Sequence, residues 1–148
     1  MNANLKRAIE HQVCIPRELM ETVAWKTLST AGKGLFLEMR AALTADNNGA
    51  FVVSHHGNDE SSYLSKYRAI SQLEALGFIR RTWTVDWIEQ ESRHVTFAFT
   101  DIEIMKTSYN GHLERRATFA YQRFGKKVDA KRAIKFFDPI SSTYQTYI

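Results

Sequence analysis

The most constraining feature of the sequence is a glycine that separates a helical pattern from two strand-like patterns. Residues 62–76 have apolar side chains at helical spacing, and Gly77 follows where a helix C-cap glycine belongs. Glycine adopts the left-handed conformation needed there at low cost. Residues 78–87 and 93–99 then alternate between apolar and polar side chains, and the segment 88–92 between them is short and polar. The sequence therefore predicts a helix that runs directly into a β-hairpin.

The helix of residues 62–76 is predicted to have one buried face and one exposed face. At about 100° per residue, four apolar side chains fall within about 120° of arc and predict the buried face: Ala69, Ile70, Leu73 and Leu76. Tyr67, Arg68 and Ser71 fall on the opposite side and are expected to be exposed. Lys66 falls nearer the apolar side, which leaves the start of the helix open.

Upstream of this unit, the sequence predicts two helices, a turn and a short strand, in that order: residues 16–28, 29–43, 47–49 and 51–53. Pro16 suits the first position of a helix, and Ser29 or Thr30 can cap the next one. The polar residues 54–62 form either a short helix or a loop. The predicted fold class is α+β, mainly α.

Positive charge is concentrated in the last quarter of the 148 residues. Residues 1–112 carry 12 Lys and Arg against 13 Asp and Glu, whereas residues 113–148 carry 8 against 3. Residues 113–137 predict a basic amphipathic helix that could bind phosphates or pack on a second subunit, and we favour a mixed role. The expected organisation is an N-terminal extension over 1–15, a central domain over 16–101, and a basic helical extension and tail over 102–148.

This order of elements resembles the winged helix-turn-helix family. Tyr67-Arg68-Ala69-Ile70 and Leu73-Glu74-Ala75-Leu76-Gly77-Phe78-Ile79 look like a recognition helix and a first wing strand. Three further segments are similar to winged helices of plasmid and phage replication proteins and of MarR-like regulators. They are Trp25-Lys26-Thr27-Leu28-Ser29, the helix after it, and the Asn47-Asn48-Gly49 turn. The similarity covers residues 16–100. It implies a winged helix-turn-helix with additional N- and C-terminal helices.

The resemblance implies sequence-specific binding of double-stranded DNA, by a transcriptional regulator or by the DNA-reading part of a replication initiator from a mobile element or bacterium. The recognition helix of such a protein enters the major groove. There Arg68 would pair with guanine, and Tyr67 would contact sugar or a thymine methyl group. The wing and the basic C-terminal segment would add phosphate contacts. The implied DNA-binding residues are Ser65, Lys66, Tyr67, Arg68, Ser71, Arg80, Arg81, Arg93, Arg115, Arg116, Lys126 and Lys127.

The same features also allow another interpretation. Lys66 and Arg68 could form a solvated face, and the wing arginines could pair with the acidic residues of the hairpin: Asp86, Glu89 and Glu91. The near-neutral residues 1–112 and the acidic wing tip keep a second function open, a winged-helix protein–protein interaction module such as a phage-encoded inhibitor of a host complex. RNA binding has no motif to support it and is a minor option.

Catalysis, cofactors and bound metals are not expected. Gly32-Lys33-Gly34 lacks phosphate-loop spacing, and Cys14 has no evident histidine partner. His55-His56 lacks a third ligand at suitable spacing, so a polar loop is expected there. No apolar run approaches the roughly 20 residues of a membrane span, and no signal peptide is evident. We expect a cytoplasmic protein, and the sequence leaves open whether it forms a homodimer.

Overall fold

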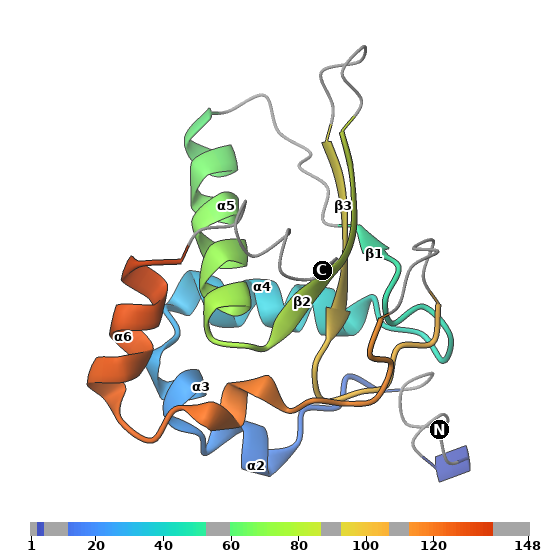
Figure 1. The fold of residues 1–148 in the computed structure, drawn as a ribbon, viewed down its shortest axis with the longest axis horizontal. Helices are drawn as coiled ribbons and strands as arrows, with labels where there is room; N and C mark the ends of the chain where they lie inside the picture. The colour runs from blue at the N-terminus through green and yellow to red at the C-terminus, as the bar shows by residue number, and fades with distance from the viewer. Residues whose placement is uncertain (1–2, 5–11, 53–59, 87–92, 107–112, 138–148) are drawn as a thin grey trace.

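The structure, a computed structural model, describes residues 3–4, 12–52, 60–86, 93–106 and 113–137, with backbone alone at 51–52, 60–64, 83–86 and 93–95. Helices and a small antiparallel sheet make up its regular structure, which confirms the expected α+β, mainly helical class (Figure 1). The elements in chain order are α2 (Arg17–Met20), α3 (Val23–Thr27), α4 (Thr30–Ala41), β1 (Phe51–Val52), α5 (Glu60–Ala75), β2 (Ile79–Asp86), β3 (Arg93–Phe99), the 3₁₀ helix η1 (Ala120–Arg123) and α6 (Lys127–Lys135).

Helix α5 ends at a Schellman-type cap and passes directly into β2, as the sequence predicts. Gly77 has a φ of +81°, in the left-handed region. The Phe78 N–H donates to the Leu73 carbonyl at 2.9 Å, and the Gly77 N–H donates to the Glu74 carbonyl at 3.1 Å. A Cβ atom on Gly77 would lie 2.7 Å from the carbonyl carbon of Ala120. Gly77 is therefore required by a close backbone contact as well as by its conformation.

The sheet has the strand order β1-β3-β2, with both pairs antiparallel. The hairpin register pairs Ile79 with Phe99 and Asp86 with Arg93, and it is interrupted by a bulge between Arg81 and Trp83. Thr82 lies at this bulge and is fully buried. Its hydroxyl donates to the Gly49 carbonyl at 2.6 Å, which ties the hairpin to the turn before β1. The three predicted strands are confirmed over the residues that the structure describes.

The prediction of a single helix over residues 16–28 is wrong, because the chain forms two short helices there, α2 and α3. Thr22 lies between them, where its hydroxyl donates to the Leu19 carbonyl at 2.7 Å and accepts from the Trp25 N–H at 3.2 Å. Such local bonding lets a threonine side chain end one helix and cap the next. The prediction for α4 is confirmed, with Ser29 as its N-cap.

One hydrophobic core joins the central region to the C-terminal segment. Phe36 contacts Phe78 and Phe99 edge to face, with ring centroids 5.8 and 5.2 Å apart. Tyr121 stacks on Phe78 with an interplanar angle of 11° and a centroid distance of 5.2 Å. Ala130 of α6 is also fully buried. Residues on both sides of the boundary expected after residue 101 therefore share this core.

The long helix predicted over residues 113–137 is wrong. Residues 113–119 are irregular, and only η1 and α6 are helical in this range. The N–H groups of Thr118 and Phe119 donate to the Thr100 carbonyl at 2.9 and 3.0 Å, so they are taken by a tertiary contact. Phe119 also has a φ of +49°, which a right-handed helix excludes. Helical periodicity in the sequence did not reveal this competition for backbone hydrogen bonds.

Helix α5 and the hairpin both extend upward from the level of α4 in Figure 1, and α6 lies beside the lower half of α5. α4 packs along α5, and α6 packs against α3 and α5. Within the described part of the chain, no helix has both the length and the apolar composition needed to cross a membrane.

Candidate nucleic-acid interface

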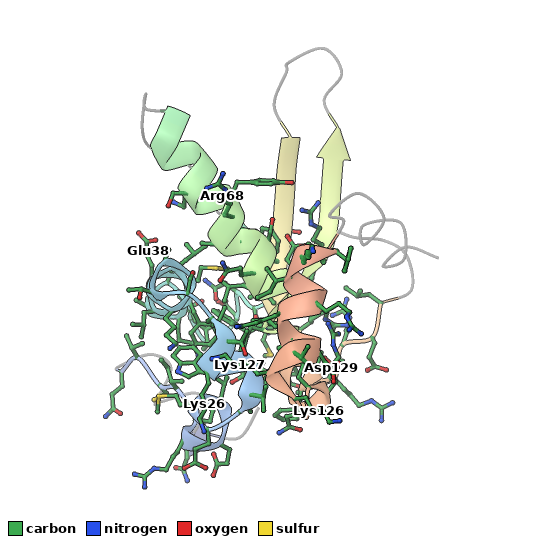
Figure 2. The ribbon with its side chains drawn as sticks, turned by 90° about the vertical axis from the view of Figure 1, so that its left-hand side faces the viewer. Lys26, Glu38, Arg68, Lys126, Lys127 and Asp129 are labelled. Carbon is green, nitrogen blue, oxygen red and sulfur yellow. The ribbon has the colours of Figure 1, made fainter. Side chains whose placement is uncertain are left out.

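Helix α5 presents the face that the sequence predicts. Ala69, Leu73 and Leu76 are buried, whereas Tyr67 is 44% exposed and Arg68 is also exposed. In Figure 2, Arg68 lies on the part of α5 that extends beyond α6. The outer surface of α5 is therefore open at Arg68 among the residues that the structure describes.

The remaining candidates on α5 surround Tyr67 and Arg68. Ser65 is exposed, and Ser71 is half-buried. Lys66 is half-buried and lies inside the helix, because α5 begins at Glu60. The start of the helix, which the sequence left open, is thus more than a turn before Lys66. We use the name α5 face for four of the candidates on this helix, without Lys66: Ser65, Tyr67, Arg68 and Ser71.

A buried ion pair that the sequence analysis missed fixes α5 to the hairpin. The Arg81 guanidinium donates to the Glu74 carboxylate, with Nε–Oε2 and Nη2–Oε1 distances of 3.0 and 3.1 Å. The two side chains are only 13% and 3% exposed. Burial raises the pKa of Glu74, although the hydrogen bond and charge of Arg81 act in the opposite direction. The one hint in the sequence is a charged residue, Glu74, at the edge of an apolar helix face.

Arg80 is also engaged within the fold. Its Nη2 donates to the main-chain carbonyl of Glu114. Burial lowers the pKa of Arg80 below its ordinary value, while the charge of Glu114 acts in the opposite direction. Arg80 and Arg81 therefore position the hairpin and the C-terminal segment. These contacts within the fold were not part of the sequence interpretation, which considered phosphates and the acidic residues of the hairpin as partners.

The third wing arginine, Arg93, lies at the far end of the hairpin, in register with Asp86. Its side chain is outside the described part of the structure, as are Glu89 and Glu91 at the expected wing tip. His55 and His56 also lie outside the described residues.

The C-terminal candidates form a second exposed group. Arg115 and Arg116 are exposed, and Arg116 pairs with Glu114 at an Nε–Oε1 distance of 3.3 Å. The backbone N–H of Arg116 is the main cause of a lowered pKa at Glu114. Lys126 and Lys127 are exposed at the start of α6, at the end that lies away from Arg68 in Figure 2. The predicted site residues therefore divide between the α5 face and the C-terminal segment.

A cavity of about 340 Å³ lies near the N-terminal segment, away from both groups. Arg40 and Asp101 line it, and their side chains are 2% and 4% exposed. Arg40 donates to the Asp101 carboxylate and, through Nε at 2.9 Å, to the Cys14 carbonyl. These two charged groups satisfy each other and hold the segment before α2 against the core. Among the described residues, no group of three or more His, Cys, Asp or Glu could hold a metal ion.

Comparisons with protein-family models, with curated proteins and with solved structures give no match in any of the three.

Proposed function

We propose that the protein binds double-stranded DNA sequence-specifically through the α5 face, as a transcriptional regulator or as the DNA-reading part of a replication initiator. The observation that carries this proposal is the exposure of Tyr67 and Arg68 on a helix whose opposite face is buried in the core. A helix supported in this way can enter the major groove, which admits an α-helix. Arg68 would read guanine there, and Ser65 would contact a phosphate or a base edge.

The order of elements supports a winged-helix architecture for this proposal. Helix α4 is followed by β1, α5 and the hairpin, and β1 pairs with β3 at the edge of the sheet. A short helix or loop was expected over residues 54–62. Residues 54–59 of this segment lie outside the described part of the chain, and α5 itself begins at Glu60. The hairpin extends in the same direction as α5 (Figure 1), as a wing that flanks the groove would.

The wing has a narrower role in this proposal than the sequence suggested. Arg80 and Arg81 are engaged with Glu114 and Glu74, so they hold the hairpin in place. Direct reading of bases is therefore assigned to Tyr67 and Arg68.

Selection of bound duplexes from a random library at near-physiological salt tests the proposal first. On the selected duplex, Arg68→Ala should weaken binding by about 1–3 kcal/mol, or about 5- to 150-fold, and relax specificity at one base position. Arg17→Ala is the control, because Arg17 is exposed on α2, away from the α5 face. Equal affinities for wild type and Arg68→Ala would show that Arg68 does not contact the duplex. Negligible duplex binding even at low salt would reject the whole proposal.

A second candidate function is a winged-helix protein–protein interaction module, such as an inhibitor of a host complex. Two observations favour it: the engagement of two wing arginines inside the fold, and the exposure of Leu37, 45% exposed on α4. A protein surface tolerates such an apolar side chain better than a phosphate backbone does. Absence of duplex binding, together with a stable complex with a host protein that Tyr67→Ala or Leu37→Ala weakens, would support this function instead.

A further inference from the structure

Helix α6 carries a row of exposed positive charges that runs beside its buried side. Ala130 is fully buried and Ile134 is partly buried, and together they define the inner side of the helix. Asp129 is the one acidic residue within α6. No carboxylate forms an ion pair with the exposed cations of α6 among the residues that the structure describes. We call these exposed cations the α6 face: Lys127, Lys131, Arg132 and Lys135.

The α6 face is held on the same core as the α5 face. Tyr121 precedes α6 and stacks on Phe78. Nη2 of Arg123 donates to the Ala75 carbonyl at the end of α5, at 2.6 Å. Figures 1 and 2 both show α6 next to the lower part of α5. The cations are thus carried on a packed helix whose position relative to Arg68 is set by these contacts.

A second copy of the chain is a poor occupant for this face. Two-fold association through α6 would place the same cationic surface of two protomers face to face. Like charges at such an interface oppose association. Val128 and the C-cap residue Phe136 are exposed, at 57% and 71%, but they are eight residues apart, and Arg132 lies midway between them on the same side of the helix. The chemistry of the surface fits a polyanion better than it fits a copy of itself.

We infer that the α6 face binds the phosphate backbone of the duplex beside the groove that α5 enters. This inference rests on the proposed function and assigns α6 to DNA rather than to a dimer. Lys127, Lys131 and Lys135 are spaced four residues apart, so their row is about 12 Å long. Phosphates on one DNA strand advance about 3.4 Å each along the duplex axis and also wind around it, so a straight row of this length can lie against about two or three of them.

The test compares two double variants that remove the same charge. Lys131→Gln/Lys135→Gln changes the α6 face, and Arg17→Gln/Lys106→Gln removes two exposed cations elsewhere. Affinity for the selected duplex and for a random duplex is measured from low to high salt. Each lost phosphate contact reduces the salt slope by about 0.9, so the α6 variant should lose about 1.8. The ratio of the wild-type affinity to the variant affinity should then fall by about 60-fold for each tenfold rise in salt, on both duplexes. The control variant should keep the wild-type slope.

The outcomes separate this inference from the proposed function. Duplex binding by wild type with an identical slope in the α6 variant would overturn the role of α6 and leave the α5 proposal standing. A loss of self-association in Lys131→Gln/Lys135→Gln, seen by analytical ultracentrifugation, would show that α6 contacts a second copy and would also overturn the inference. A wild-type protein that binds neither duplex at low salt would overturn both proposals. A lowered slope in the α6 variant alone would support the inference.

Discussion

Replacement of Gly77 by alanine should destabilise the protein more than any ordinary helix-end substitution. Gly77 has a φ of +81°, and an added Cβ would lie 2.7 Å from the Ala120 carbonyl carbon and 2.9 Å from the Tyr121 nitrogen. The left-handed conformation costs an alanine about 1–2 kcal/mol. Because the contacted atoms are backbone, they cannot rotate away, and forced overlap of this kind costs about 1–3 kcal/mol more.

These costs are offset only slightly by the lower entropy that alanine gives to the unfolded chain, about 0.4–1 kcal/mol. The expected loss is therefore about 2–4 kcal/mol, which corresponds to a fall in Tm on the order of 10 °C for a chain of this length. Thermal and urea unfolding followed by circular dichroism would measure it.

Two further substitutions separate the causes. Gly77→Asn tolerates the left-handed conformation but retains a Cβ atom, so it should remain well below wild type in stability. Gly34→Ala is the matched control, since a Cβ at Gly34, inside α4, meets no atom within 4 Å. It should stabilise the protein by about 0.5–1 kcal/mol. Wild-type stability in Gly77→Asn would refute the contact with the Ala120 backbone, and equal effects of alanine at the two glycines would refute the reasoning altogether.

Two other predictions concern the buried polar groups. Burial raises the pKa of Tyr121 from 10 to about 12, so Tyr121 ionises at a lower pH in the unfolded chain than in the folded chain. The contribution of Tyr121 to the free energy of unfolding is therefore complete below pH 10 and should fall between pH 10 and about 12. Tyr121→Phe should remove this part of the alkaline loss in urea titrations at several pH values, and an unchanged pH profile would contradict it. Asn48 is fully buried, accepts from the Phe99 N–H at 2.8 Å, and donates to three carbonyls, so Asn48→Ala should cost about 3 kcal/mol or more by leaving buried groups unpaired. A loss below about 1 kcal/mol in chemical unfolding would show that water or rearrangement replaces these bonds.

The features that the sequence predicted depend on local signals. The faces of α5, the cap at Gly77 and the hairpin after it follow from side-chain periodicity and from the conformational preference of glycine. Ser29 as the cap of α4 also follows from a preference that acts within one helical turn. The α5 face could therefore be located from the sequence before any tertiary contact was known.

The features that the sequence missed depend on partners far away along the chain. Asn48 was assigned only to a turn, yet its side chain bonds to the backbone around residues 99–103. The role of Tyr121 depends on Phe78, and the irregular residues 113–119 depend on the Thr100 carbonyl. Arg80 and Arg81 were expected to contact phosphates or acidic residues of the hairpin, because nothing in their spacing indicated Glu114 or Glu74 as partners.

The position of Tyr121 in the core has a consequence for folding during synthesis. α5 and the hairpin leave the ribosome before Tyr121, which stacks on Phe78, and before Ala130, which is buried in the same core. A nascent chain that ends near residue 101 therefore presents one side of Phe78 uncovered, and such exposed apolar surface favours misassembly. Stable folding has to wait until the segment containing residues 121–130 has been translated and has emerged.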